Sequence, residues 1–373
     1  MTSILISGAS VAGPALAYFL SRHGFTVTVV ERAPALRPGG QAIDVRGAAL
    51  TVAERLGVHA DLRRRRTHMK GMSMLDGDGN ELWRSTEVAL SSGRLDSDDV
   101  EVLRDDLTGL LYDRTHQDVE YVFGDSVTSL VQDEHGVHVT FERSAPRTFD
   151  LVVGADGLHS NVRRLAFGPE RDFVRHLGTY VSIFSTENYL GLEDWQTWFD
   201  DGTVGGVIYP VRGNAELRVN IGFRSEDPVE YDHRDIQAQK RLVAERLAHA
   251  RWEVPRLVKA MWTAPDFYFD SMAQVSMDRW SAGRVTLLGD AGYCASPLSG
   301  QGTSLALIGA YVLAAELAGS GYEAAYAAYE ARMRPFVELN QALIEQNREL
   351  MEQDPSGESP LDSVKNAIQL PEL

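Results

Sequence analysis

Glycines and one acid near the N-terminus are the residues whose types and spacing could bind a phosphate-bearing ligand. Gly8 and Gly13 enclose the stretch GASVAG, in which Ser10 stands where the usual pattern has a third glycine. Glycine at both ends allows a sharp turn and close packing of the helix that follows. Glu31 comes about 20 residues later, where a carboxylate can accept hydrogen bonds from both ribose hydroxyls. This spacing predicts a dinucleotide site, and the alternative is a plain packing turn between helix and strand.

Two further glycine-rich stretches each carry an acid. GADGLHSNVR begins at Gly154 and contains Asp156, and GDAGYCASPLSGQG begins at Gly289 and contains Asp290. The second stretch ends at residues 300–303, GQGT, where an alanine-rich segment predicts a helix. Because a helix N-terminus presents unpaired N–H groups and a positive dipole end, this opening favours negative charge beside it. The alternative is an ordinary glycine-rich helix start.

The elements around these motifs must hold them at one edge of a parallel sheet. Residues 4–6 and 27–30 are apolar runs that predict strands, and residues 14–23 carry an apolar helical face. Strand, tight turn, helix and strand form the first βαβ unit of a dinucleotide-binding fold. Residues 150–153 and 283–290 predict two more buried strands, the second of which ends in an acid.

A second sheet is predicted between residues 171 and 272. Aromatic residues become dense there, and period-2 runs at 205–209 and 217–223 predict a mostly antiparallel sheet. Alternation gives such a sheet one apolar face, which we expect to line a pocket for a substrate. Candidate substrate contacts are Tyr209, Phe223, Phe267 and Met272. The alternative is that these four are plain core residues.

The charges of this segment bear on the size of the substrate. An apolar wall with few charges suits a planar, polycyclic, phenol-bearing molecule. A small carboxylate would need a dedicated arginine, and Arg212, Arg218 and Arg224 leave that option open.

Other segments predict helices and a hairpin. Residues 101–112 and 236–250 have helical spacing, and residues 322–350 predict a long amphipathic helix. Residues 361–370 predict a short one, after a loosely ordered stretch. The run DGDGN between residues 75 and 81 predicts a hairpin turn.

Composition excludes several classes of protein. The chain has 373 residues with a formal net charge of −17, which argues against binding of nucleic acid. Its one cysteine, Cys294, fits a reducing compartment, and the apolar runs are too short for a membrane span, so we expect a cytoplasmic protein. The ten histidines lack metal-ligand spacing, so no metal site is expected.

The three glycine-rich motifs, in this order, resemble the single-component flavin-dependent aromatic hydroxylases, the family of p-hydroxybenzoate hydroxylase. Within it they are especially similar to the tetracycline-inactivating monooxygenases and related actinobacterial enzymes. The resemblance implies an α/β fold: a Rossmann-like FAD-binding domain with an inserted, mostly antiparallel β-sheet substrate domain and a long C-terminal helix. The implied boundaries are 1–71, 98–170 and 273–320 for the FAD-binding domain, 72–97 and 171–272 for the substrate domain, and 321–373 for the C-terminal helical segment.

The resemblance also implies the reaction. FAD and NADPH would be the cofactors, and O₂ would hydroxylate an aromatic or polycyclic small molecule through a flavin C4a-hydroperoxide. A monomer or homodimer is expected. The alternatives are a flavin-dependent dehydrogenase or reductase on the same fold, and a non-catalytic FAD-containing ligand-binding protein.

The implied site residues are flavin contacts, and no further catalytic residue is assigned. Glu31 would bind the adenosine ribose, Arg104 and Asp290 the ribityl and pyrophosphate region, while Asp156 lies in a motif connected with FAD and NADPH. The full set of implied cofactor contacts is Gly8, Ser10, Val11, Ala12, Gly13, Glu31, Arg32, Asp44, Arg46, Arg104, Asp156, Asp290, Pro297, Gly300, Gln301, Gly302 and Thr303. The chain departs from the family pattern at Tyr293, where a histidine is usual, which bears on the flavin contacts.

Overall fold

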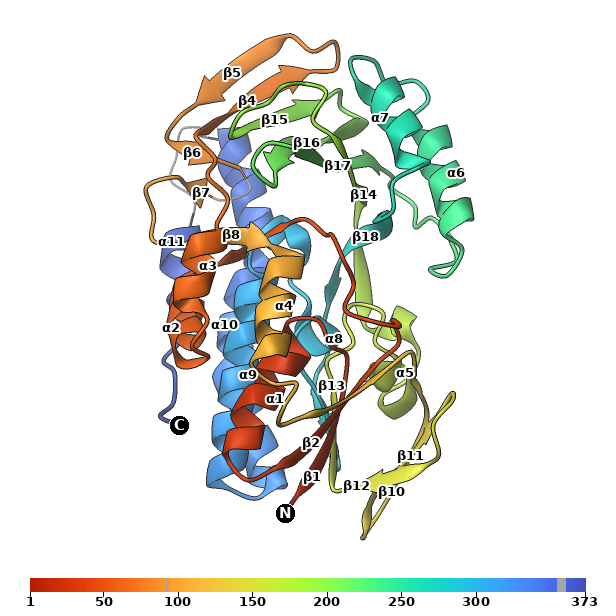
Figure 1. Ribbon diagram of the computed structural model, residues 1–373, viewed down its shortest axis with the longest axis vertical. Coiled ribbons are helices and arrows are strands. Elements are labelled where there is room, and N and C mark those ends of the chain that lie inside the picture. Colours follow the sequence, from red (N-terminus) through yellow and green to blue (C-terminus); the bar gives the residue numbers. More distant parts are fainter. Residues whose placement is uncertain (91–92, 354–359) are drawn as a thin grey trace.

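A six-stranded, mostly parallel sheet forms one half of the molecule (Figure 1). The computed structural model describes residues 1–90, 93–353 and 360–373. The strand order is β19-β20-β13-β1-β2-β9, and only β19 runs antiparallel to its neighbour. The bounds are β1 (Ser3–Ser7), β2 (Thr26–Glu31), β9 (Glu120–Phe123), β13 (Leu151–Gly154), β19 (Ser281–Ala282) and β20 (Val285–Leu287). The central strands are buried along nearly their whole length, as their continuous apolar runs require.

Helices cover this sheet. α1 (Ala12–Arg22) packs on α9 (Gly302–Gly319), and α9 lies between α1 and the long α10 (Tyr322–Gln353). α9 is the one described helix long and apolar enough to cross a membrane, but 67% of that stretch is buried inside the protein. Its apolar residues therefore serve as core. The other helices here are α2 (Ala48–Arg55), α3 (His59–Arg65), α4 (Arg104–Asp113), α5 (Asn161–Ala166), the 3-10 turn η1 (Glu170–Asp172), α8 (Asp290–Tyr293), the 3-10 turn η2 (Pro297–Ser299) and α11 (Leu361–Val364).

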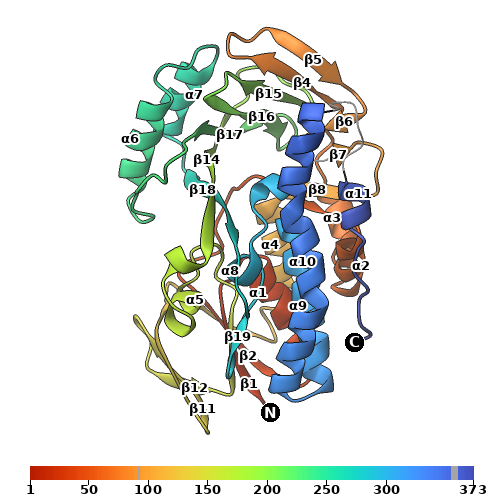
Figure 2. The ribbon, with the colours of Figure 1, turned by 180° about the vertical axis from the view of Figure 1, so that it is seen from behind.

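A seven-stranded sheet forms the other half, in the order β18-β14-β17-β16-β15-β4-β5. Its strands are antiparallel except for the parallel pair β4 and β15. The bounds are β4 (Gly71–Asp76), β5 (Glu81–Ser85), β14 (Val174–Glu187), β15 (Trp195–Asp200), β16 (Val204–Val211), β17 (Glu216–Arg224) and β18 (Tyr268–Val275). α6 (Ile236–Arg246) and α7 (Val254–Met261) cover one face. β14 and β18 extend from this sheet into the other half (Figure 2).

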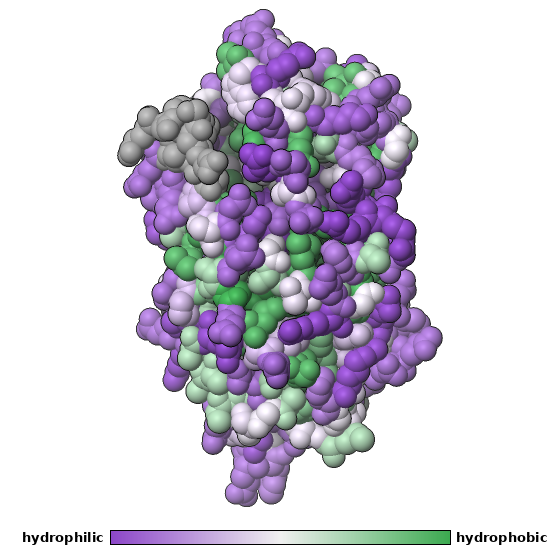
Figure 3. All heavy atoms as spheres, turned by 90° about the vertical axis from the view of Figure 1, so that its left-hand side faces the viewer, coloured by the Kyte–Doolittle hydropathy of each residue, from purple (hydrophilic) through white to green (hydrophobic). Residues whose placement is uncertain are grey.

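Small ribbons complete the fold. β3 (Ala42–Val45) pairs with β8 (Val100–Leu103) between the two large sheets. β6 (Val88–Ala89) pairs with β7 (Gly93–Arg94), and β10 (Val127–Asp133), β11 (Gly136–Phe141) and β12 (Arg147–Phe149) form a separate three-stranded sheet. On the face drawn in Figure 3, hydrophilic residues predominate and apolar residues gather in small groups, in keeping with the acidic composition.

Several predicted boundaries are wrong. The predicted helix at 101–112 begins as strand β8, since Val100 and Val102 are buried against β3, and the helix starts only at Arg104. The predicted strand at 283–290 is shorter, and its terminal acid, Asp290, instead begins α8. The predicted short helix near the C-terminus covers only Leu361–Val364. The loosely ordered stretch expected at 354–359 lies outside the described residues.

Candidate active site

The turn between β1 and α1 is packed so tightly that two positions admit only glycine. Gly8 has a φ of +110°, and a Cβ added to it would lie 2.3 Å from the backbone oxygen of Ala155. A Cβ on Gly13 would lie 2.0 Å from the backbone oxygen of Gly8. The first motif therefore rests directly on the second. α1 starts after Val11 without a side-chain cap, which leaves its first N–H groups open to a ligand.

Glu31 lies at the end of β2, beside this turn. Its carboxylate accepts hydrogen bonds from the backbone N–H groups of Ala9, at 2.9 Å, and Ala33, at 2.8 Å. Glu31 thus braces the glycine-rich turn itself, a role that the sequence did not reveal. Ser10 is half-buried and Arg32 is exposed at the same end of the sheet.

The third motif packs against the first. Gly289 has a φ of +65°, and a Cβ there would lie 3.4 Å from the Cβ of Ala12. Asp290 follows with an exposed side chain, and its Oδ1 lies 3.9 Å from where a Cβ on Gly302 would be. Desolvation by the surrounding protein raises the pKa of the Asp290 carboxyl. The side chain is nevertheless exposed to solvent, so a ligand can reach it. Asp290 therefore stands between the N-termini of α1 and α9.

The segment before α9 contains a buried amide with unmet hydrogen bonds. Gln301 is 0% exposed, and neither polar atom of its side chain has a partner among the described residues. Pro297 is exposed, whereas Gly300, Gly302 and Thr303 are half-buried around it. A buried unsatisfied amide is costly, so Gln301 carries two unmet hydrogen-bonding atoms next to the start of α9.

Asp44 and Arg46 reach the same place from β3. Their side chains pair at 2.9 Å, and the backbone N–H of Arg46 donates to the Oγ of Ser304 at 3.1 Å. Burial raises the pKa of Asp44 to about 7, although Arg46 acts in the opposite direction. Arg46 Nη1 lies 3.5 Å from a Cβ position on Gly300, so β3 and the start of α9 are in contact.

Arg104 stands at the first position of α4, under the loop that precedes β3. Its Nη2 donates to the backbone oxygen of Gly39 at 2.7 Å, and burial lowers its pKa to about 10. A Cβ on Gly39 would lie 2.5 Å from Oδ2 of Asp266. This loop therefore lies between Arg104 and the second sheet.

Two residues of the second motif have structural partners that were not expected. The carboxylate of Asp156 accepts the backbone N–H groups of Asn161, at 2.9 Å, and Val162, at 3.1 Å, at the start of α5. Arg163 is 0% exposed and donates to the backbone oxygen of Ala291 at 2.9 Å. The side chain of Arg163 is enclosed between α5 and α8, so it is not open to a cofactor phosphate.

One of the four substrate candidates lies on the face turned toward β3 and β8. Tyr209 is buried with Val207 and Val211, and its hydroxyl accepts the backbone N–H of Ala42 at 2.7 Å. Burial raises the pKa of this hydroxyl. Met272 is half-buried on β18, two residues after Asp270.

The other two candidates are on the opposite side, which corrects the prediction. Phe223 belongs to the apolar cluster under α6 and α7, and its ring stacks on Tyr180 with centroids 5.2 Å apart. Phe267 precedes β18 and packs against the same cluster, with the Lys240 ammonium 5.2 Å from its ring centroid. Period-2 alternation separates two faces but does not say which of them α6 and α7 cover.

The arginines considered for a small carboxylate substrate all have acidic partners. Arg218 pairs with the buried Asp266 at 2.6 Å, and Arg224 pairs with Asp200 at 2.6 Å. Arg212 contacts two acids of α4. Sequence reasoning missed Asp266 and Ser304. No local spacing could have identified Ser304, whose partner Arg46 is 258 positions away.

Comparison with known proteins shows which family this chain belongs to and which proteins it is similar to. A profile of the FAD binding domain family matches residues 1–342. A flavin-dependent monooxygenase from an unknown prokaryotic organism is 40% identical over 314 residues, which cover 84% of this chain and 80% of its own. An uncharacterized protein of Mycobacterium tuberculosis (strain ATCC 25618 / H37Rv) is 54% identical over 330 residues, 88% of each chain. The crystal structure of tetracycline destructase Tet(51) is 35% identical, with a TM-score of 0.90 and 100% of both chains covered.

Proposed function

Because the chain belongs to the family of the FAD binding domain, and its relatives include flavin-dependent monooxygenases, we propose that it uses FAD, NADPH and O₂ to hydroxylate an aromatic or polycyclic substrate. The observation that carries the proposal is the meeting of three motifs around the exposed Asp290 carboxylate. Bound FAD would supply the redox and oxygen-transfer chemistry. The chain's own residues bind it, orient the substrate and exclude water.

The residues present fit FAD. The glycine-only turn at Gly8 and Gly13 leaves room for a pyrophosphate beside the open N-terminus of α1. Glu31 is the carboxylate for the adenosine ribose, and Asp290 the acceptor for ribityl hydroxyls. The unpartnered side-chain amide of Gln301 supports a polar ring system beside it.

Two features would support negative charge on the bound ring without a change of protonation. The N-terminus of α9 directs open N–H groups and the positive end of its dipole toward the segment of Asp290. The guanidinium of Arg46 lies against Gly300, just before that terminus. Both are fixed by packing, so they need no rearrangement as charge develops.

We propose that a planar polycyclic substrate binds beside the sheet face that carries Tyr209. Val207 and Val211 lie beside Tyr209 on that face and all three are buried, so an apolar ring system next to them would be shielded from water. The arginines nearby are already neutralised by acids, which disfavours a small free carboxylate. The relative of known structure is named for tetracycline, and a tetracycline-like or anthraquinone-like molecule suits the same wall.

NADPH would reach the site from outside. The chain has one strand–glycine turn–helix unit with a terminal acid, which the FAD adenosine half would use. Arg164 is exposed on α5, and the arginines at 63–66 are exposed at the end of α3, where the first three already pair with acids. We propose that one of these two groups meets a phosphate of NADPH. A stoichiometric, sub-micromolar NADPH site separate from FAD would contradict this part of the proposal.

The decisive experiment is substrate-stimulated NADPH oxidation with oxygen uptake by the FAD-loaded protein. We expect a tetracycline- or anthraquinone-like compound to stimulate both and to gain one oxygen atom from ¹⁸O₂. NADPH oxidation with substrate reduction but no oxygen uptake would favour a reductase instead. FAD bound without any turnover would favour a ligand-binding flavoprotein. Coupled turnover of hydroxybenzoates alone would overturn the polycyclic substrate while leaving the monooxygenase chemistry in place.

A further inference from the structure

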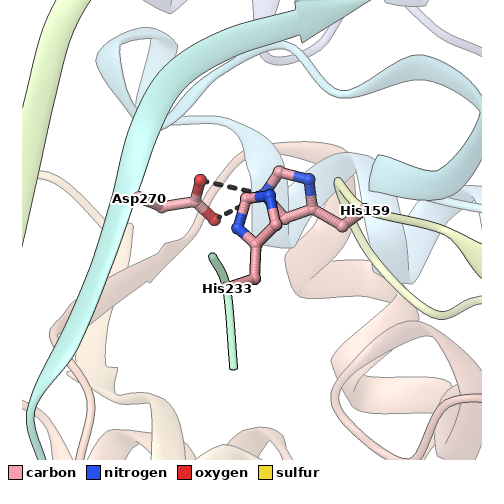
Figure 4. Close-up of side chains that lie close together, drawn as sticks. All are labelled: His159, His233 and Asp270. Atoms are coloured by element: carbon pink, nitrogen blue, oxygen red, sulfur yellow. Dashed lines mark hydrogen bonds and ion pairs between the residues drawn. The ribbon is translucent and has the colours of Figure 1, made fainter. Parts of the chain in front are cut away.

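Three side chains that lie far apart in the sequence converge where the two halves of the molecule meet (Figure 4). His159 lies within the second glycine-rich motif, His233 precedes α6, and Asp270 lies on β18. One ligand atom from each lies within 4.8 Å of the others. We propose that this trio is a binding site for one Zn²⁺ ion. The proposal is independent of the flavin chemistry proposed above.

The groups behind the three side chains are arranged as in protein zinc sites. The Nδ1 of His159 lies 2.9 Å from Glu170, which leaves Nε2 pointing at Asp270 at 2.9 Å. A carboxylate on the far nitrogen of a ligating histidine fixes its tautomer and ring orientation. The Asp270 carboxylate is held in the same way by two hydroxyls, from Tyr231 at 2.8 Å and Tyr268 at 2.6 Å. Both prospective ligands are thus oriented by outer partners.

In the metal-free form a proton takes the place of the ion. Nε2 of His159 and the Asp270 carboxylate are 2.9 Å apart and share a hydrogen bond. Zn²⁺ would replace the proton between them, and that proton would go to solvent. His233 would coordinate through its neutral imidazole.

The three ligand atoms need to approach one another only slightly to bind zinc. Zinc–nitrogen bonds are about 2.0–2.1 Å, which brings tetrahedral ligand atoms to roughly 3.3 Å from one another. His233 is exposed, and its ring centroid lies 3.7 Å from that of His159. Rotation of this exposed side chain can supply the movement. Two imidazoles and one carboxylate leave a fourth position for water, a ligand set that zinc accepts readily.

Through His233, the ion would connect the segment before α6 to both halves of the molecule. His159 belongs to the half that carries the glycine motifs, and Asp270 to the seven-stranded sheet. A zinc ion between them would link the two halves of the molecule, with water at its fourth position and without redox chemistry of its own. The histidine spacing in the sequence could not indicate this, because each ligand comes from a different element.

The experiment is calorimetric titration of ZnCl₂ into FAD-loaded, full-length protein, freed of its affinity tag and pretreated with a chelator. We expect one ion per chain and a raised Tm. His233→Ala should weaken binding about 100-fold or more, and Glu170→Gln roughly 10–100-fold. His135→Ala, an exposed histidine in the β10–β11 turn, should bind as wild type does.

Co²⁺ provides a second readout. Bound in place of Zn²⁺, it should give the visible bands of a tetrahedral site in the wild type and in His135→Ala, but not in His233→Ala. FAD content should be unchanged in all these variants, which distinguishes loss of the metal site from misfolding. Absence of saturable binding, or equal binding by His233→Ala and wild type, would overturn the proposal.

Discussion

Asp44 and Arg46 form an ion pair of 2.9 Å beside the start of α9, with side chains only 9% and 2% exposed. Burial raises the pKa of Asp44 from 3.8 to about 7. Between about pH 4 and pH 7 the folded chain therefore holds a proton on Asp44 that the unfolded chain releases, and above this range Asp44 is ionised and pairs with Arg46. The stability that the protonated Asp44 contributes is fully present below about pH 4 and is lost as pH rises through about 7. We expect the wild type to become progressively less stable than Asp44→Asn across this window.

Urea unfolding of the FAD-free protein at several pH values measures this difference. Asp118→Asn, a change at an exposed aspartate, is the matched control. A difference between wild type and Asp44→Asn that stays constant from pH 4 to pH 8 would show that Asp44 titrates normally.

Gly13→Ala should abolish FAD binding, whereas Gly109→Ala should not. The added methyl group at Gly13 would meet the backbone oxygen of Gly8 at 2.0 Å and force α1 away from the turn. Gly109 lies inside α4 with nothing within 4 Å of a Cβ, so alanine there should stabilise the protein by about 1 kcal/mol. Flavin absorbance after gel filtration and Tm measure the two effects. Full FAD content in Gly13→Ala would refute the close packing of this turn.

Asp290→Ala should weaken FAD binding without unfolding the protein. Loss of the carboxylate leaves the ligand donors that it serves without an acceptor, at a cost of about 1–3 kcal/mol, or roughly 5–150-fold in Kd. Titration of the apoprotein followed by flavin fluorescence gives the Kd, and Asp118→Ala is the control. An unchanged Kd would mean that Asp290 does not face the cofactor.

Arg218→Met should destabilise the protein by about 3–5 kcal/mol, because it leaves the buried Asp266 carboxylate without its cation. Arg218→Met combined with Asp266→Leu should recover most of this loss, since no buried charge then remains. Denaturant midpoints of the single and double variants complete the cycle. Additive losses would show that the two side chains do not interact.

The order and type of most elements could be predicted because they depend on local patterns. The apolar runs of β1 and β2 and the helical face of α1 are visible in the residues themselves, as is the hairpin of β4 and β5 around DGDGN. β8 was mistaken for helix because its pairing partner, β3, is distant in the chain, and tertiary pairing there overrides helical spacing.

The positions of single side chains were harder to predict for a related reason. Alternation put Tyr209 and Phe223 among the same candidates, yet they lie on opposite faces of the sheet, and only the packing of α6 and α7 decides which face is which. Arg163 has the residue type of a phosphate ligand, but its burial depends on Ala291, which is 128 positions away.

The strand order of the six-stranded sheet also determines how long each strand lacks its partner while the chain is being synthesised on the ribosome. β1 pairs with β13 through Ile4 and Leu151, and β13 pairs with β20 through Val152 and Val285. At a translation rate of about 5–20 residues per second, β13 is synthesised roughly 7 to 30 s after β1, so one edge of β1 is unpaired during that time. β20 is synthesised about as long again after β13. Until then the nascent chain carries an open apolar strand edge, which is a substrate for chaperones. If translation stops before Val285, β13 lacks its neighbour β20, and the chain also lacks Asp290 of the third motif.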